Sequence, residues 1–399
     1  MSFGYRVLGF GSSEISLFPQ ENFALSDELL VNGTNALDVI GFAMDRHNRG
    51  KGAIAYRDGT NMRVKIFTTD TSGVITMGSQ QTVDIGSNFR GDADQLAYFN
   101  DNKFAVGYIK NGDNQNQTTN GCMRFCTISG TTVTFGSEVV IRAAYTNGLQ
   151  IACDTSITDR VAAMFVTTDS GGYRTKVIAA TITNTTPDFS GMTELTGDNG
   201  DSYSLAYHDN TCIATFKDHQ NGYDGYATGL GISGKTIGKG DNVQYDTATH
   251  ANSSFPAVNP NNNQECIVSN NNKSNSKPQM KIGSLNSNNI TFGSFITASD
   301  KNVGNTKVRF NKLFNDKIVV FYDDEDESAA DGVLRFKVGT IDGSSINFGD
   351  EITLPGSSTG HGGLLEFDYN DAGDDKFFYL YRNADNDTAI RVGQMGGRS

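Results

Sequence analysis

The segment Ile346-Asn347-Phe348-Gly349-Asp350-Glu351-Ile352 follows the turn Asp342-Gly343 and recurs along the chain. Copies with the same order of β-branched residue, aromatic residue and glycine occur at 133–139 and 290–296. With weaker copies included, the sequence carries seven such markers, whose glycines are Gly11, Gly78, Gly136, Gly191, Gly240, Gly293 and Gly349. Markers spaced about 57 residues apart on average indicate an array of structural repeats.

A second landmark precedes each marker by some 22 to 29 positions, and it is an apolar run that ends in an aromatic residue. Six of the seven repeats have it, with the aromatic residues Tyr56, Tyr108, Phe165, Phe216, Tyr322 and Tyr381. The fifth repeat has Ile267-Val268-Ser269 instead. Further strand-like runs lie before and between the landmarks, separated by Gly, Asn, Asp and Ser clusters, so each repeat is predicted to be a meander of four strands.

Four-stranded repeats of this length are the unit of a β-propeller. The last repeat shows three strand-like runs, around 366–369, 377–381 and 389–395, and the orphan copy at 5–17 would supply its fourth strand. One blade is therefore predicted to contain both ends of the chain, which closes the ring and protects a sheet edge. A pair of β-sandwich domains or a parallel solenoid is the alternative.

The prediction is thus one all-β domain over 1–399, a seven-bladed β-propeller with four-stranded antiparallel blades. Residues 1–17 are assigned as the closing strand of the last blade. The predicted blades span approximately 37–85, 93–142, 148–196, 202–246, 254–298, 305–354 and 363–395.

The composition limits the classes of function. The 399 residues carry a net charge of −13 at pH 7 with no local cluster of Lys or Arg, so we expect no nucleic-acid partner. No stretch reaches the roughly 18 to 20 apolar residues of a membrane-spanning helix, so we expect no membrane insertion. The first residues lack a charged leader followed by an apolar core, so no Sec-type signal peptide is expected. The five cysteines form no CxxC pair and no zinc-ligand spacing, which favours buried free thiols.

Acidic residues in or beside the predicted innermost strands are the candidates for chemistry in a central channel. Glycoside hydrolysis needs two carboxyl groups about 5 to 10 Å apart. A catalytic set or an acidic, cation-binding channel would draw on Asp38, Asp94, Asp154, Glu366 and Asp368. Against an enzyme, the chain has no Trp for sugar platforms and lacks the S-x-D-x-G-x-T-W box of sialidase propellers.

Nucleophilic hydrolysis has no clear candidate either. The five histidines accompany no GxSxG elbow. The pairs His208-Asp209 and Asp218-His219 would place adjacent side chains on opposite faces of a strand, so we expect turn or surface histidines.

Loops rich in Asn, Gly and Asp hold the candidates for contact with a partner. Tyr173 and Tyr223 lie in two such loops, and an exposed tyrosine buries a large area at low entropic cost. Local packing of these rings is the alternative interpretation.

The acidic run at 323–327 lacks the alternation and mid-loop glycine of a calcium loop, so it is interpreted as a solvated hairpin tip. We therefore predict no catalytic residue, no cofactor and no structural metal.

Residues 317–353 read K-I-V-V-F-Y-D-D, then, after a short acidic segment, G-V-L-R-F-K-V-G-T-I-D-G-S-S-I-N-F-G-D-E-I-T. This cadence resembles repeats in structural proteins of tailed bacteriophages, particularly those of marine and cyanobacterial phages. The resemblance spans all seven repeats and is strongest in the second, fifth and sixth. It implies a virion component that carries a propeller and is assembled in the host cytoplasm, and it supplies no catalytic residues.

We accordingly expect a non-enzymatic virion protein of the capsid or tail surface. Its partners would be other virion proteins and, in host attachment, a glycan or protein of the host surface. The alternative is a carbohydrate-active propeller, an enzyme or a lectin, that uses the acids at the channel mouth. Two acids at glycosidase separation would favour this alternative, whereas a mouth filled by side chains would favour the virion protein.

Overall fold

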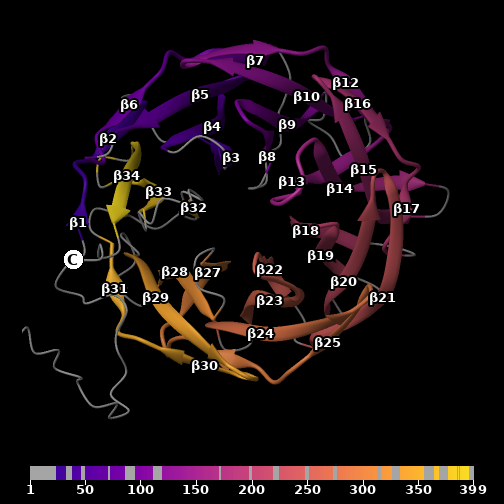
Figure 1. Ribbon diagram of the computed structural model, residues 1–399, viewed down its shortest axis with the longest axis vertical. Coiled ribbons are helices and arrows are strands. Elements are labelled where there is room, and N and C mark those ends of the chain that lie inside the picture. The colour runs from indigo at the N-terminus through magenta and orange to yellow at the C-terminus, as the bar shows by residue number, and fades with distance from the viewer. Residues whose placement is uncertain are drawn as a thin grey trace, which may run out of the picture.

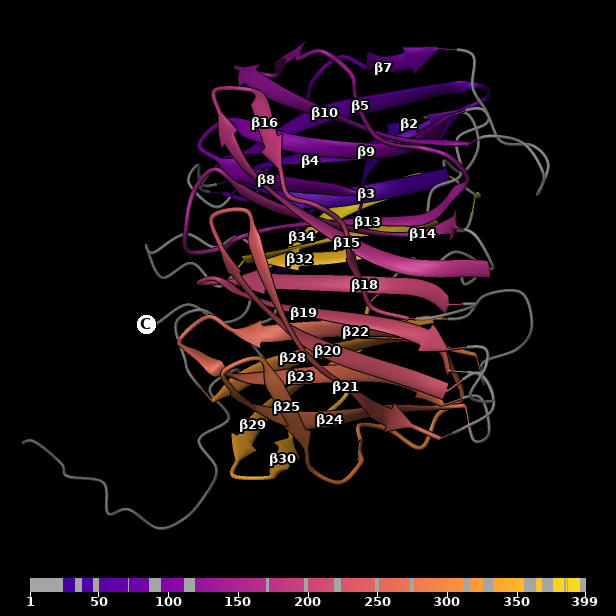
Figure 2. The same ribbon diagram turned by 90° about the vertical axis from the view of Figure 1, so that its right-hand side faces the viewer.

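The computed structural model describes residues 24–32, 38–45, 50–70, 72–85, 95–110, 119–169, 172–196, 200–218, 224–247, 251–272, 276–311, 316–325, 333–354, 364–367, 376–383, 385 and 387–394. In these residues seven sheets form a ring around a central channel (Figure 1). The side view shows the strands of neighbouring sheets running across the thickness of the ring (Figure 2). The described residues include no helix long and apolar enough to cross a membrane.

Each sheet is one blade, and in blades 1 to 6 the strands run from the channel to the outer rim in chain order; in blade 7 the outer strands come from the N-terminal part of the chain. Blade 1 comprises β3 (Asp38–Met44), β4 (Lys51–Asp58), β5 (Asn61–Thr69), β6 (Ile75–Met77) and β7 (Gln81–Ile85). Blade 2 comprises β8 (Leu96–Asn100), β9 (Lys103–Lys110), β10 (Asn120–Ser129), β11 (Thr132–Phe135) and β12 (Val139–Ala143). Blade 3 comprises β13 (Thr146–Cys153), β14 (Arg160–Asp169), β15 (Gly172–Thr183), β16 (Thr186–Phe189) and β17 (Thr193–Glu194).

The remaining blades follow the same plan. Blade 4 comprises β18 (Gly200–His208), β19 (Thr211–Asp218), β20 (Asp224–Ser233) and β21 (Thr236–Asp246). Blade 5 comprises β22 (Ala251–Asn259), β23 (Asn262–Asn272), β24 (Lys277–Asn286), β25 (Asn289–Phe292) and β26 (Ile296–Thr297). Blade 6 comprises β27 (Val303–Phe310), β28 (Lys317–Asp324), β29 (Val333–Asp342), β30 (Ser345–Phe348) and β31 (Ile352–Thr353). Blade 7 comprises β32 (Leu364–Phe367), β33 (Lys376–Arg382), β34 (Thr388–Gln394), β1 (Ala24–Leu25) and β2 (Leu29–Asn32).

In the blades other than blade 4, the outermost strand is divided at the sequence marker into two short strands. In blade 2, β11 and β12 both pair with β10, and Gly136 between them donates its amide hydrogen to the carbonyl oxygen of Phe125 at 3.0 Å. The same backbone hydrogen bond, from the marker to the third strand, is made by Gly78, Gly136, Ser190, Gly293, Gly349 and Ser26. In blade 4 the outer strand β21 is continuous and contains Gly240. The marker of blade 3 is therefore Ser190, one residue before the predicted Gly191.

The ring is closed by an N-terminal segment, as the repeat pattern predicted. Strand β1 pairs with β34 at Ala24↔Gln394, and β2 pairs with it at Leu29↔Ile390. The closing position therefore belongs to 24–32 rather than to the assigned 1–17, which lies outside the described residues. The marker of this blade is Ser26, whose amide donates to the carbonyl oxygen of Val392 at 2.9 Å.

Ser26 occupies the marker because the conformation there does not demand glycine. None of the described marker glycines, Gly78, Gly136, Gly293 and Gly349, has a positive φ. A side chain is therefore tolerated where it fits, and the Ser26 hydroxyl accepts a hydrogen bond from the Val392 amide at 2.9 Å. Ser190 does the same for the Ala179 amide at 3.0 Å.

The hydrophobic core lies between the blades. One cluster joins Val64 of blade 1 to Tyr98 and Val106 of blade 2, and all three side chains are buried. Further clusters repeat this face-to-face packing, including Phe67 of blade 1 with Phe378 of blade 7, whose ring centroids are 5.6 Å apart. Each fully buried side chain of this kind contributes roughly 1.5 to 3 kcal/mol, so most of the stability is distributed around the ring.

Candidate functional site: the central channel

Residues at equivalent pairing positions in the innermost strands of the blades line the channel. In six blades the residue at this position pairs with the residue three positions before the aromatic end of the second landmark, as in Ala43↔Ala53 before Tyr56 and Arg309↔Val319 before Tyr322. In blade 5, which lacks the aromatic residue, Ala257 pairs with Ile267. The lining residues at this position are Ala43, Ala97, Ala152, Ala206, Ala257 and Arg309. By backbone pairing, the equivalent residue of blade 7 is Glu366. Five alanines leave little side-chain volume, so the channel retains a cavity of about 130 Å³ that is partly open to solvent.

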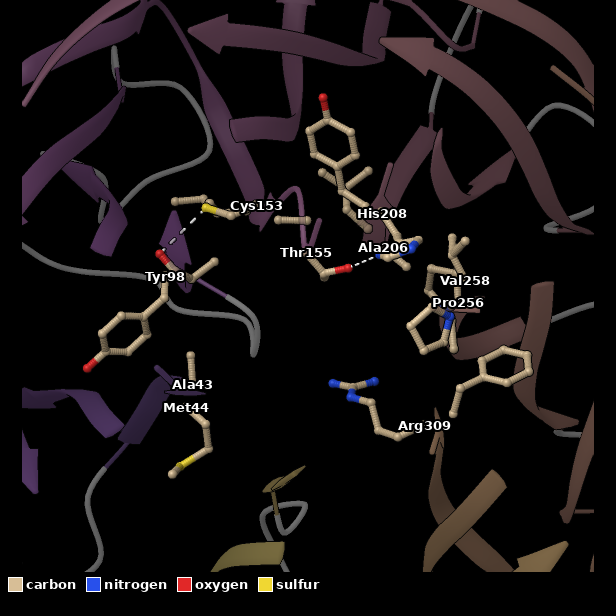
Figure 3. Close-up of a pocket in the computed structure, with 18 of the residues that line it drawn as sticks. Ala43, Met44, Tyr98, Cys153, Thr155, Ala206, His208, Pro256, Val258 and Arg309 are labelled. Atoms are coloured by element: carbon tan, nitrogen blue, oxygen red, sulfur yellow. Dashed lines mark hydrogen bonds between the residues drawn. The ribbon is translucent and has the colours of Figure 1, made fainter. Parts of the chain in front are cut away.

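Arg309 brings a charge into this small-residue ring. Its guanidinium extends from β27 toward the middle of the cavity (Figure 3). Nη1 donates a hydrogen bond to the Val308 carbonyl oxygen at 3.1 Å. The apolar part of the lining includes Met44, Pro256 and Val258.

His208 and Thr155 form a polar pair at the end of the channel where the innermost strands finish. His208 is the last residue of β18, and its Nδ1 is hydrogen-bonded to the Thr155 hydroxyl (Figure 3). Thr155 is fixed in turn because its amide donates to the Tyr207 carbonyl oxygen at 3.1 Å. His208 therefore lines the cavity instead of lying in a surface turn.

Asp154, one of the predicted channel acids, has a structural role in this region. Its carboxylate accepts four backbone hydrogen bonds of 2.8 to 3.0 Å. The donors are the amides of Ser156, Ile157, Asp209 and Asn210. Two of these donors belong to blade 3 and two to blade 4, so the buried carboxylate joins the two blades at their first turns.

The other predicted acids are placed only in part. Asp38 begins β3 opposite Arg57, and Glu366 lies in β32 opposite Phe378, at the register position of Arg309. Asp94 and Asp368 lie outside the described residues.

Of the two tyrosines proposed for contacts with a partner, the structure describes one. Tyr173 is 37% exposed and packs edge-on against Tyr145, with ring centroids 5.2 Å apart. Local packing thus accounts for much of its surface. Tyr223 lies outside the described residues.

Metal-binding side chains do not gather in the described part of the chain, where no group of three or more His, Cys, Asp or Glu could hold an ion. In the acidic run at 323–327, Asp324 is fully buried and its Oδ2 accepts a hydrogen bond from Arg335 Nε at 2.6 Å. The interpretation of a solvated tip therefore fails for Asp324.

The five cysteines are all buried, as expected, and burial raises the pKa of the Cys122 thiol to about 12.

Around the channel, hydrogen bonds link the turns between the first and second strands of neighbouring blades, and we call these contacts the hairpin belt. Besides Asp154, the belt includes Asn102 N to Asp45 Oδ2 at 3.1 Å, between blades 1 and 2. Asn100 Nδ2 donates to Asp159 Oδ1 at 3.0 Å, between blades 2 and 3. Asn263 Nδ2 donates to Asp209 Oδ2 at 2.9 Å, between blades 5 and 4. Because each contact spans two blades, the belt fixes their relative positions at the channel.

A second repeated contact lies nearer the rim, and we call it the rim pair. The tyrosine of the second landmark donates its hydroxyl hydrogen to the side chain two residues after the marker. Tyr108 donates to Glu138 at 2.6 Å and Tyr56 donates to Gln80 at 2.7 Å. The remaining rim pairs are Tyr322–Glu351 and Tyr381–Glu28. Burial raises the pKa of Tyr56 to about 12, so its hydroxyl stays a donor at neutral pH.

The rim pair of blade 7 joins the two ends of the chain. Glu28 accepts hydrogen bonds from Tyr381 and from Asn383 Nδ2, the latter at 2.8 Å, and Arg391 Nη2 lies 3.6 Å from its carboxylate. Burial opposes the charged form of Glu28, but these partners together outweigh it and hold the pKa of Glu28 below its ordinary value.

Lysines add a third set of contacts between neighbouring blades. Lys337 Nζ donates to the Ala298 carbonyl oxygen at 2.8 Å, from blade 6 to the end of blade 5. Lys65 of blade 1 donates in the same way to the Val31 carbonyl oxygen of blade 7. The closing segment 24–32 is therefore held both by the other strands of blade 7 and by the neighbouring blade 1.

No family model matches the chain, and no curated protein matches it in sequence. Among solved structures it is similar to the WD40 domain of Toxoplasma gondii coronin, with a TM-score of 0.60 and 8% identity over 95% of this chain and 87% of that chain. It is also similar to the periplasmic gluconolactonase PpgL of Pseudomonas aeruginosa, with a TM-score of 0.51 and 8% identity over 85% of this chain and 94% of that chain. At these identities the similarity establishes the seven-bladed propeller fold and nothing about function.

Proposed function

We propose that this chain is a non-enzymatic structural component of a bacteriophage particle, exposed at the capsid or tail surface. The observation that carries the proposal is the repeat cadence at 317–353, which resembles repeats of phage structural proteins. Its partners would be other virion proteins and, in host attachment, a glycan or protein of the host surface.

The construction of the ring is compatible with a rigid platform of this kind. The hairpin belt, the rim pairs and the lysine contacts fix neighbouring blades to one another, and both neighbours hold the closing segment. A closed propeller has few exposed sheet edges, and its loops can vary without disturbing the core. Such a scaffold suits a protein that acts by surface complementarity.

The test is to purify particles of the phage that encodes this chain by density gradient and to quantify the chain by mass spectrometry. The chain should be present at several copies per particle and should remain after a high-salt wash. A non-structural protein of the same phage serves as the control and should be depleted in the same fraction. Absence of the chain from intact particles would contradict the proposal.

The carbohydrate-active alternative has one observation in its favour, which is that Glu366 occupies the register position of the channel-lining ring next to Arg309. An enzyme or lectin of this class would lose oligosaccharide turnover or binding when the candidate acids are changed to Asn or Gln. The positions to test are Asp38, Asp94, Asp154, Glu366 and Asp368. Against it, the Asp154 carboxylate already accepts four backbone hydrogen bonds.

A further inference from the structure

We propose that a buried water molecule joins blades 3 and 4 beside the hairpin belt, where it accepts hydrogen bonds from the Tyr207 hydroxyl and Arg160 Nε and donates one to Asp154 Oδ2. This inference concerns the interior of the ring and does not depend on the role proposed for its outer surface. It rests on two buried donors without a protein partner and on a carboxylate oxygen with room for one more hydrogen bond.

The Tyr207 hydroxyl lies in the interior without a hydrogen-bonding partner among the described residues. Its side chain is 2% exposed and packs in one apolar cluster with Ala152 and Ala162 of blade 3. A buried phenol normally has a partner, because its hydroxyl loses the hydrogen bonds that it makes to bulk water. A partner other than a side chain is therefore expected at this position.

Two groups of opposite charge lie near this hydroxyl. The carbonyl oxygen of Arg160 accepts the Asp154 amide at 3.2 Å, and the neighbouring Thr155 amide donates to the Tyr207 carbonyl oxygen at 3.1 Å, so the first turn of blade 3 meets the end of β18. Arg160 Nε is buried and has no partner in the described part of the chain. Burial raises the pKa of Tyr207, the Asp154 carboxylate raises it further, and the Arg160 guanidinium opposes the rise.

Asp154 retains capacity for one further hydrogen bond. Oδ1 accepts three backbone amides, whereas Oδ2 accepts that of Asn210 at 2.9 Å, and each carboxylate oxygen has two lone pairs. Two donors and one acceptor match a water molecule, which makes about three hydrogen bonds at a buried site. Arg160 would repel a cation and Asp154 would repel an anion, so a neutral ligand fits best.

A second tyrosine, at the equivalent position of blade 2, supports the assignment. Tyr98 follows the channel-lining alanine of its blade as Tyr207 does in blade 4, and its hydroxyl is also buried without a partner among the described residues. Asp45 of blade 1 occupies the position that Asp154 has in blade 3. Burial raises the pKa of Tyr98, and Asp45 raises it further. We therefore expect a water molecule at this interface as well.

A high-resolution crystal structure of the full chain tests the site directly. An ordered water should lie within roughly 2.6 to 3.2 Å of Tyr207 Oη, Arg160 Nε and Asp154 Oδ2. Density at that point that refines as a metal ion or a halide would overturn the proposal. So would a map without density there in which the three side chains are well ordered.

Phenylalanine variants give an independent test in solution, because the sign of the effect distinguishes a hydrated hydroxyl from an unpaired one. Tyr207→Phe should lower the melting midpoint by about 1 to 2 °C, since the water loses a hydrogen bond. An unpaired hydroxyl is unfavourable in the interior, so without the water the same variant should melt above the parent. Tyr98→Phe should behave like Tyr207→Phe, whereas Tyr173→Phe changes an exposed tyrosine and should melt like the parent. A midpoint of Tyr207→Phe at or above that of the parent overturns the proposal.

Discussion

Glu28 is the residue on which the joining of the chain ends depends most directly. It receives hydrogen bonds from Tyr381 and Asn383, which lie more than three hundred positions further along the chain. Its counterpart in blade 2, Glu138, receives the same bond from Tyr108, but there the outer strand is linked to its neighbour by a short hairpin. The tyrosine bond is the same in both contacts, but the further partners differ: Glu138 also accepts from Lys110 Nζ at 2.7 Å, and Glu28 accepts from Asn383 Nδ2 at 2.8 Å.

Replacement of Glu28 should destabilise the fold because its contact joins the two ends of the chain. Glu28→Ala removes a charged acceptor and leaves the hydroxyl hydrogen of Tyr381 without an acceptor, while its oxygen still accepts from Arg391 Nε. The free energy of unfolding should fall by about 2 kcal/mol. Glu28→Gln should cost about 1 kcal/mol, because blade 1 already uses Gln80 as the acceptor for Tyr56. Urea unfolding of these variants and of Glu138→Ala provides the measurement. A parent-like midpoint for Glu28→Ala would show that the rim pair of blade 7 does not stabilise the closure.

The depressed pKa of Glu28 also predicts a dependence on pH. A carboxyl group whose pKa is lower in the folded chain than the ordinary 4.5 stabilises the fold above that pH, and this contribution is lost as the pH falls through the folded value. The difference in unfolding free energy between the parent and Glu28→Gln should thus be largest near pH 7 and should shrink below about pH 4. Urea unfolding of both proteins at pH 7 and pH 3 measures it, and a difference that is the same at both values would contradict the assignment.

At the scale of single elements, the first turns do more than connect strands. Asp154 follows β13 and binds the backbone of the turn between β18 and β19, so its position depends on two blades at once. Because these bonds go to backbone amides, the contact holds the path of the chain rather than a particular side chain. The hairpin belt is therefore a device for spacing blades around the channel.

Asp154→Asn should destabilise the fold although the two side chains have nearly the same shape. An asparagine presents a donor on one side, so either the three amides at Oδ1 or the Asn210 amide at Oδ2 would face an N–H group. The expected loss is about 2 kcal/mol in the free energy of unfolding. Asp342→Asn, at the exposed end of β29, makes the same chemical change and should have little effect. Equal midpoints for the two variants in thermal unfolding would refute the belt's contribution.

At the scale of the whole molecule, the repeat predicted the seven blades and the sharing of one blade between the two ends of the chain. It placed the closing segment wrongly because glycine was taken as the marker, whereas the physical requirement is a backbone amide bond and, in four blades, a tyrosine-bound Glu or Gln. The series Leu25-Ser26-Asp27-Glu28 meets that requirement without glycine. A search for landmark tyrosines paired with Glu or Gln two residues after the marker would have found it.

The channel was harder to predict for a different reason. The sequence analysis looked for acids near the innermost strands, but the lining depends on which residues share one register position across blades. β-bulges shift that register within several first strands, including β3 between Val39 and Gly41 and β27 between Val303 and Thr306. Counting along one strand therefore does not reveal that Arg309 is equivalent to Ala43, since the pairing with the second strand decides it.

The closure itself can be tested by two deletions that the structure distinguishes. Removing residues 1–32 takes away β1 and β2, which leaves the outer edge of β34 unpaired and the Lys65 contact without its acceptor. This variant should aggregate or lose its single cooperative transition in calorimetry, since a propeller with an open blade exposes both a sheet edge and the apolar face of blade 1. Removing residues 1–17 retains 24–32 and should keep a transition close to that of the parent. If the shorter deletion disrupts melting as much as the longer one, the ring depends on residues before Ala24, and pairing by 24–32 is not sufficient to close it.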